Sequence, residues 1–390
     1  MEYDIVVVGG GPTGLATAWH TAARGRRTLV LDRHGFFNER AGSGGAERHW
    51  RLQYTQEDLF RLTLETLPLW RRLEELAERT LVHSTGSLWF GDIEVETNEG
   101  QIAATARTMD RLDVPYEWLG ARDIEKRFGF ARLPAHYEGF LQPDGGTIDV
   151  RGTLAALYRL AQENGAILSG GERALEVLPD ADGVTVRTDR GTHRAAKAVL
   201  ANGPGINDLL APLGARLGIR LYEMALVTLR RRAPDHLPFW FVFQQPAEQD
   251  TNLFYGFGHN PWSPGDLVRL GPDFEVDPLP DADAATGRAD PRHVRRLCSW
   301  VERHLPVLDP HPVRTGSCLA VLPADPARQF HLGRADGLVP HGEHLVLHSS
   351  GWGFKLVPLL GRICADLAID GRTASDIARL APTAPQEAQP

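Results

Sequence analysis

Three glycines near the start of the chain have the spacing of a pyrophosphate-binding turn. Residues 9–14 read GGGPTG, so Gly9, Gly11 and Gly14 satisfy G-x-G-x-x-G. Asp32 follows 18 residues after Gly14. Glycine lets backbone N–H groups approach a phosphate, and a carboxylate after the next strand can accept hydrogen bonds from a ribose. The pattern predicts dinucleotide binding; a tight structural turn is the alternative.

The elements that must position these residues are present around them. Residues 4–8 (DIVVV) are typical of a strand buried on both faces, and residues 28–32 (TLVLD) predict a second strand ending in Asp32. Between them apolar residues recur at helical spacing, and the N-terminus of that helix would offer partial positive charge to a phosphate. Arg33, directly after Asp32, is a further candidate cofactor-binding residue.

A second motif of this kind is not found. Residues 201–205 (ANGPG) lack the third glycine, and we interpret them as a strand end that returns to the same nucleotide, with Gly203 at the site. One motif predicts one dinucleotide. If the dinucleotide is FAD, its electrons come from the substrate and leave to oxygen or to a partner protein, because no nicotinamide-binding module is evident.

Composition excludes several classes of function. The chain has 42 basic and 50 acidic residues and a net charge of −8, which argues against nucleic-acid binding. No apolar run reaches the ~18–20 residues of a membrane span, and the N-terminus lacks the pattern of a signal peptide. Three cysteines occur at no metal-ligand spacing, so we expect neither a metal site nor a disulfide framework. We expect a cytoplasmic protein.

Periodicity predicts the remaining elements. A helix is expected over residues 55–79, with a capping box from Thr55 and Asp58 and a kink at Pro68, and a last helix is expected at about 356–370, ending at Gly371. Strands are predicted in seven further segments: 86–91, 173–179, 183–188, 197–201, 222–230, 252–258 and 344–350. This alternation indicates an α/β nucleotide-binding domain interrupted by sheet-rich insertions.

Four features follow one another along the chain: the glycine motif, AERHWRLQY at 46–54, the cysteine within RTGSCLAVLPADPARQF at 314–330, and SSGWGFK at 349–355. This order resembles the monomeric sarcosine oxidase family of FAD-dependent amine oxidases over nearly the whole chain. The resemblance implies an α/β, two-domain flavoprotein with a Rossmann-type FAD-binding domain. Stretches such as GFLQPDGGTIDVRGTLAAL are similar to family members that convert piperideine-2-carboxylate to picolinate for peptidyl nucleoside antibiotics.

The predicted domain limits follow from this assignment. The FAD-binding domain is expected to comprise residues 1–82, 145–220 and 320–378. The substrate-binding domain is expected to comprise residues 83–144 and 221–319. Residues 379–390 are expected to form a flexible tail.

The resemblance also implies how the flavin is held. Cys318 matches the family position that forms a thioether to the flavin, although a lone cysteine is more often a buried apolar residue. Arg48 matches an arginine near the flavin ring; because it stands three residues before Arg51, we expect both on one helical face. Further cofactor contacts are expected from the loop that opens the last helix: Gly351, Gly353 and Phe354.

Arg51 and Lys355 match the pair that holds the substrate carboxylate in the family. An arginine can bind a carboxylate with two parallel hydrogen bonds, whereas a lysine acts as a point charge. Lys355 alone would more often be a surface cation. Trp352 stands where simple sarcosine oxidases have a smaller or polar residue, and its ring would suit stacking on a flat substrate; core packing is the alternative.

Three more residues match pocket positions of the family, and a fourth, Arg269, departs from the family pattern. Glu99 or Asp273 would accept or orient the ring N–H proton, and Tyr255 would line the pocket; surface charge or sheet packing is the alternative for each. Arg269 stands where sarcosine oxidases have the lysine that activates oxygen. It keeps a positive charge there, but with a larger side chain.

Together with these residues, the resemblance implies a monomeric flavin oxidase of a small cyclic imino acid that carries a carboxylate, with molecular oxygen reduced to hydrogen peroxide. Two alternatives stay open. The substrate would instead be sarcosine, another N-methyl amino acid or a proline-like amine; or the chain would bind a dinucleotide as a redox sensor without turnover.

Overall fold

The short β-branched runs form the parallel centre of a mixed sheet. The computed structural model describes residues 2–40, 42–233, 236–246, 252–263, 265–272 and 277–383. β1 (Tyr3–Val8) pairs in parallel with β2 (Thr28–Asp32) on one side and with β12 (Thr192–Leu200) on the other. β19 (Leu345–Ser349) pairs with the end of β12, and β18 (His331–Arg334) lies beside it. The outer strands are β9 (Ile167–Gly170), β10 (Ala174–Asp180) and β11 (Gly183–Thr188).

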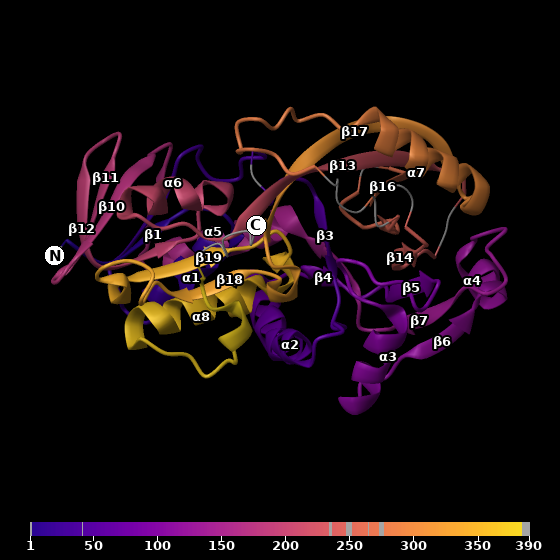
Figure 1. Cartoon of the computed structure of the whole chain (residues 1–390), viewed down its shortest axis with the longest axis horizontal. Helices are drawn as coiled ribbons and strands as arrows, with labels where there is room; N and C mark the ends of the chain where they lie inside the picture. The colour runs from indigo at the N-terminus through magenta and orange to yellow at the C-terminus, as the bar shows by residue number, and fades with distance from the viewer. Residues whose placement is uncertain are drawn as a thin grey trace, which may run out of the picture.

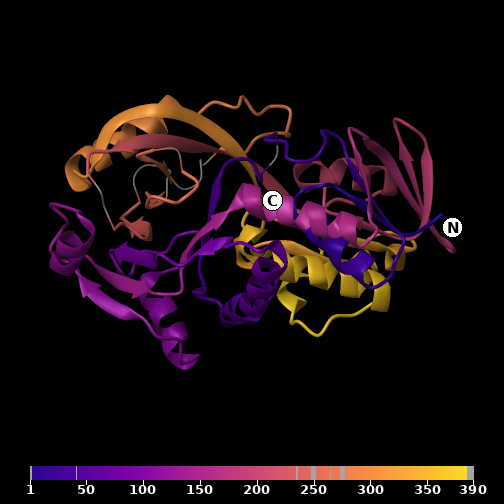
Figure 2. The same cartoon turned by 180° about the vertical axis from the view of Figure 1, so that it is seen from behind.

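Helices make both faces of β1 interior. α1 (Pro12–Ala23) begins directly after the glycine turn and contacts α5 (Val150–Glu163) and α8 (Val357–Asp370), and Figure 2 shows these helices side by side. The predicted last helix starts as a 3₁₀ turn, η5 (Gly353–Leu356), and ends at Gly371, whose φ is +71°. A short α6 (Ile206–Leu210) follows β12.

A second sheet lies on the other side of the molecule (Figure 1) and has the order β17-β13-β16-β15-β14-β5-β7-β6. Its two longest strands, β13 (Ile219–Arg231) and β17 (Leu308–Pro323), pair along nearly their whole length. The other strands are β5 (Ser87–Gly91), β6 (Glu117–Gly120), β7 (Glu138–Gln142), β14 (Phe239–Phe243), β15 (Phe254–Gly256) and β16 (Leu267–Pro272). The associated helices are α3 (Ile102–Arg111), α4 (Ala121–Phe128) and α7 (Pro291–His304).

A small third sheet lies between the two large ones (Figure 1). β8 (Gly146–Asp149) is its central strand, with β3 (Glu47–Trp50) and β4 (Val82–His83) antiparallel on either side. The prediction that Arg48 and Arg51 share a helical face is therefore wrong. Their segment is extended, and a three-residue spacing does not repeat on one side of an extended chain.

Two further expectations need correction. α2 (Glu57–Ala77) begins after Gln56 without a side-chain cap, and the Thr55 hydroxyl instead hydrogen-bonds that of Thr105 at 2.8 Å, so the capping box is not formed. The expected tail is packed at its start, because Leu380 is buried and Arg379 Nε lies 2.5 Å from Asp58 Oδ2. Residues 384–390 of that tail lie outside the described residues. None of the described helices combines the length and apolarity that a bilayer crossing demands.

Candidate active site

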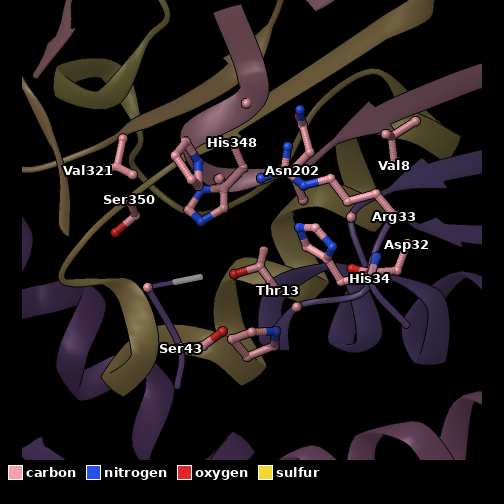
Figure 3. Close-up of a pocket in the computed structure, with 18 of the residues that line it drawn as sticks. Val8, Thr13, Asp32, Arg33, His34, Ser43, Asn202, Val321, His348 and Ser350 are labelled. Carbon is pink, nitrogen blue, oxygen red and sulfur yellow. The ribbon is translucent and has the colours of Figure 1, made fainter. Parts of the chain in front are cut away.

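A cavity of about 330 Å³ opens at the glycine turn. Its walls come from the ends of β1, β2 and β12 and from the loop before η5. Figure 3 shows Asp32, Arg33 and His34 at one end, and His348 and Ser350 at another. Nine predicted cofactor residues line it: Gly9, Gly11, Asp32, Arg33, Arg48, Gly203, Gly351, Gly353 and Phe354.

The motif glycines have different tasks. A Cβ on Gly14 would lie 1.9 Å from the Gly9 carbonyl oxygen, so Gly14 serves the close contact between turn and helix and does not line the cavity. Gly9 has φ +107°, and its Cβ would lie 2.5 Å from the Ala201 carbonyl oxygen. At Gly11 the nearest atom to an added Cβ is Ser43 Oγ at 3.9 Å. Gly11 therefore leaves open space for a phosphate to approach the backbone.

Polar atoms on the other walls also fit a dinucleotide. Asp32 accepts hydrogen bonds from the backbone N–H groups of Gly10 and His34, both at 2.9 Å, and a carboxylate keeps lone pairs for ribose hydroxyls. Asn202 Oδ1 and His348 Nδ1 line the cavity, are buried and have no hydrogen-bond partner among the described residues. Buried polar atoms are nearly always paired, so these two indicate a polar ligand.

β17 connects this cavity to a smaller one. Val321 lines the large cavity, and Cys318 lines a cavity of about 80 Å³. Two glycine loops press against the same strand. A Cβ on Gly42 would lie 2.8 Å from the Leu319 carbonyl oxygen, and one on Gly351 would lie 2.8 Å from the Val321 carbonyl oxygen. Four residues line both cavities: Gly42, Arg48, Gly351 and Phe354. The two cavities are therefore neighbouring parts of one site.

Six further predicted residues line the small cavity, although they come from distant segments. They are Glu99, Tyr255, Arg269, Cys318, Trp352 and Lys355. Cys318 stands opposite Met224 in the β13–β17 ladder, whereas Cys298 lies in α7 and Cys364 is buried in α8. Asp273 lies outside the described residues.

The two predicted carboxylate-binding cations meet at one tyrosine. Lys355 Nζ donates to the Tyr54 hydroxyl at 3.1 Å and to the Trp352 carbonyl oxygen at 3.0 Å. Arg51 Cζ lies 4.6 Å from the centre of the Tyr54 ring. Arg51 is only 1% exposed and is not among the residues that line the small cavity, and its Nη2 forms an ion pair with Glu99 Oε2 at 2.5 Å. Glu99, the residue on the cavity wall, thus stands in front of Arg51.

The electrostatics of this group follow from burial. Burial lowers the pKa of Lys355, and neighbouring Arg51 lowers it further. Burial also opposes the charge on Arg51, but Glu99 and Tyr54 outweigh burial and raise its pKa. Burial opposes ionisation of Tyr54 as well, yet Lys355 and Arg51 overcome it and lower the pKa of the phenol. The site holds two close cations and one carboxylate, so it is short of negative charge.

Two further arginines, Arg269 and Arg48, add positive charge to the wall of the small cavity. Arg269 hydrogen-bonds the Glu47 carbonyl oxygen, and its Nε lies 3.1 Å from Glu47 Oε1. Arg48 donates to the carbonyl oxygens of Gly42 and Gly44, each at 2.7 Å. Arg48 therefore fixes the loop that lines both cavities.

Sequence reasoning missed several residues of the small cavity. His49, Phe241 and Phe257 line it, as do Met224 and Leu226. The run FWFVF at 239–243 alternates between two packing layers, and this could have indicated a wall residue in a strand. His49 lies between Arg48 and Trp50 in the family motif, but no spacing rule distinguishes it from a core histidine.

Comparisons with known proteins agree with this geometry. The family model described as FAD dependent oxidoreductase matches residues 4–367. Two open-form structures of NikD, an unusual amino acid oxidase essential for nikkomycin biosynthesis, are 66% and 67% identical, with TM-scores of 0.95 and 0.93. They cover 99% and 98% of this chain and 98% of their own chains.

Curated relatives are more distant. The peroxisomal sarcosine oxidase of Homo sapiens is 29% identical over 382 residues, which are 96% of this chain and 94% of that protein. A putative bifunctional amine oxidase of Dictyostelium discoideum is 30% identical over 394 residues, which are 95% of this chain. The chain spans 36% of the length of that protein. The glycine motif, the two joined cavities and these matches together show that the chain belongs to the family of FAD-dependent oxidoreductases.

Proposed function

We propose that the chain is a flavin oxidase of a cyclic imino acid, converting piperideine-2-carboxylate to picolinate with oxygen reduced to hydrogen peroxide. The observation that carries the proposal is the small cavity, which combines cations, a carboxylate and aromatic walls beside the dinucleotide cavity. The likeness to NikD over nearly the whole chain supports the substrate class.

The flavin would lie with its dinucleotide part in the large cavity and its ring toward the small one. When bound, FAD accepts the electrons of the substrate and passes them to oxygen. Cys318 supplies the thiol for a covalent link, because it is the cysteine that lines the small cavity. A tether would fix the ring against β17.

Lys355 and Arg51 would bind the substrate carboxylate. Lys355 reaches the cavity directly, whereas Arg51 becomes available when Glu99 yields its place to the substrate. Exchange of one carboxylate for another keeps the buried guanidinium compensated, since an unpaired buried charge is costly. Trp352, Tyr255, Phe241 and Phe257 would then enclose a flat ring.

Turnover tests the proposal. The purified holoenzyme is given piperideine-2-carboxylate, sarcosine and proline in separate reactions, and hydrogen peroxide and picolinate are measured. We expect the cyclic imino acid to be oxidised at least tenfold faster than either alternative, with picolinate as the product. Faster oxidation of sarcosine or proline would assign the site to simple amine oxidation. Absence of flavin bleaching by all three would favour a redox sensor.

We further propose that the chain acts as a monomer in the cytoplasm. The curated relative in Streptomyces avermitilis is named monomeric sarcosine oxidase, which supports the first part of this proposal.

A further inference from the structure

One histidine of the small cavity has no role in the account above. His49 lines the cavity, and its ring stacks on Phe239 with ring centres 4.8 Å apart and an interplanar angle of 19°. Its Nε2 is buried and has no hydrogen-bond partner among the described residues. A buried, unpaired imidazole nitrogen behind a substrate cavity calls for a polar neighbour.

The three-stranded sheet provides that neighbour. His49 in β3 stands opposite Thr147 in β8, and Thr147 stands opposite His83 in β4. Directly opposed residues of antiparallel strands share a face, with Cβ atoms about 5 Å apart. The three side chains therefore form one row across the sheet. Thr147 is only 1% exposed, and its buried hydroxyl also has no hydrogen-bond partner in the described part of the chain.

The far end of the row reaches the outside. His83 is half-buried and packs edge-on against Trp262, with ring centres 4.8 Å apart. Glu74, Asp149 and Arg79 are the charged groups near His83. One water, or rotation of the Thr147 hydroxyl, would connect each step of the row, and a hydroxyl both accepts and donates a proton. No apolar residue interrupts the row within the sheet.

We propose that His49, Thr147 and His83 form a proton relay between the substrate cavity and solvent. Oxidation of a CH–NH unit to C=N removes two electrons and two hydrogens. FAD, when bound, would accept the two electrons together with the carbon-bound hydrogen, and the N–H proton would pass through His49 and the Thr147 hydroxyl to His83 and solvent. Conversion of dioxygen to hydrogen peroxide would consume these two electrons, the carbon-derived proton and one proton from solvent, which balances the proton released. The relay rests on the proposed function, because it requires a substrate N–H in the small cavity.

The charges around His49 suit a base that acts with substrate present. Burial lowers the pKa of His49 well below its usual value, and Lys355, Arg51, Arg48 and Arg269 lower it further. The free ring is thus neutral and has a lone pair to offer. A bound substrate carboxylate offsets two of these cations, so it makes His49 a better proton acceptor when the proton must leave.

A proton-release measurement tests the relay. The holoenzyme is mixed with substrate without oxygen in weak buffer, and flavin bleaching and a pH-indicator dye are followed together. In the wild type, we expect proton release to keep pace with bleaching. Thr147→Val removes the hydroxyl at nearly constant volume, so release should lag bleaching at least tenfold. Thr147→Ser keeps the hydroxyl and should restore synchrony.

Thr66→Val is the matched control, since Thr66 is a buried threonine of α2 whose hydroxyl bonds the Leu62 carbonyl oxygen. Synchronous release in Thr147→Val, with the wild-type time course, would overturn the relay. If Thr147→Val does not fold, His83→Ala provides the same test at the partly exposed end. Failure of the proposed function appears differently, as wild-type flavin that the cyclic imino acid does not bleach; the relay is then tested with whichever amine bleaches it.

Discussion

The large and the small cavity are built by different means. Glycines and backbone atoms shape much of the large one, where Gly9 allows the tight turn and Gly11 leaves room for a ligand to approach the chain itself. Charged and aromatic side chains shape the small one, where Lys355, Glu99 and Arg269 come from three distant segments. The difference shows that cofactor fit depends here on local backbone form. Substrate chemistry depends on side chains that only the tertiary fold brings together.

The largest expected effect follows from a substitution in the glycine turn of the large cavity. In Gly14→Ala the new Cβ would lie 1.9 Å from the Gly9 carbonyl oxygen, so turn and helix must separate. We expect loss of bound flavin and a free energy of unfolding lower by about 3 kcal/mol, as for overpacked cores. Flavin content and denaturant unfolding check this expectation.

Gly11→Ala is the matched variant, because Ser43 Oγ, at 3.9 Å, is the one atom of the described residues within 4 Å of its new Cβ. It should fold like the wild type. Wild-type flavin content and stability in Gly14→Ala would show that the turn is not the element that fits the cofactor.

The side-chain region should respond in the opposite way. Lys355→Met removes one of the cations that line the small cavity but leaves the glycine turn intact. We expect the affinity for picolinate to fall about 100-fold, since a hydrogen bond from a charged group contributes about 2–3 kcal/mol. Flavin content should stay unchanged. Titration of the flavin absorbance with picolinate measures the affinity, and the flavin-to-protein ratio measures the flavin content.

Lys197→Met serves as its control, because Lys197 bonds the Glu343 carbonyl oxygen and neither residue lines either cavity. Equal losses of picolinate affinity and flavin content in Lys355→Met would contradict the separation of the two regions and give Lys355 a structural role.

The smallest effect concerns pH. Burial lowers the pKa of His348, in the large cavity, to about 4. Between pH 4 and 6.5 the unfolded chain therefore binds the proton that the folded chain excludes, and stability falls as pH falls through this window. We expect this histidine to account for about 3 kcal/mol of that loss. His348→Asn should reduce the slope of unfolding free energy against pH by this share.

His20, whose pKa burial also lowers to about 4, leaves part of the slope in place. A His348→Asn slope equal to that of the wild type would mean that His348 is protonated in the folded protein.

Local patterns predicted the nucleotide half well. The β-branched runs at residues 4–8 and 28–32 form β1 and β2, and residues 197–201 return beside β1 as the end of β12. Gly371 ends the last helix because a glycine accepts positive φ there. Each of these features depends on neighbours in the sequence, so periodicity and turn chemistry are sufficient.

Features that depend on tertiary contacts could not be predicted from the sequence. The pairing of Arg51 with Glu99 joins residues far apart in the chain, and nothing local signals it. Residues 47–50 form a strand because β8 lies beside them, which a helical interpretation of the arginine spacing could not anticipate. Thr55 bonds Thr105 rather than capping α2, for the same reason. The domain limits and the roles of the site residues stay predictions.

The covalent state of Cys318 tests most directly the claim that the two cavities are one flavin site. Trypsin should release residues 315–328 (TGSCLAVLPADPAR) as one peptide. We predict that this peptide from the wild type is yellow and heavier by one flavin, and that acid-precipitated Cys318→Ala loses its colour. A wild-type peptide of unmodified mass, with a colourless acid pellet, would contradict the claim.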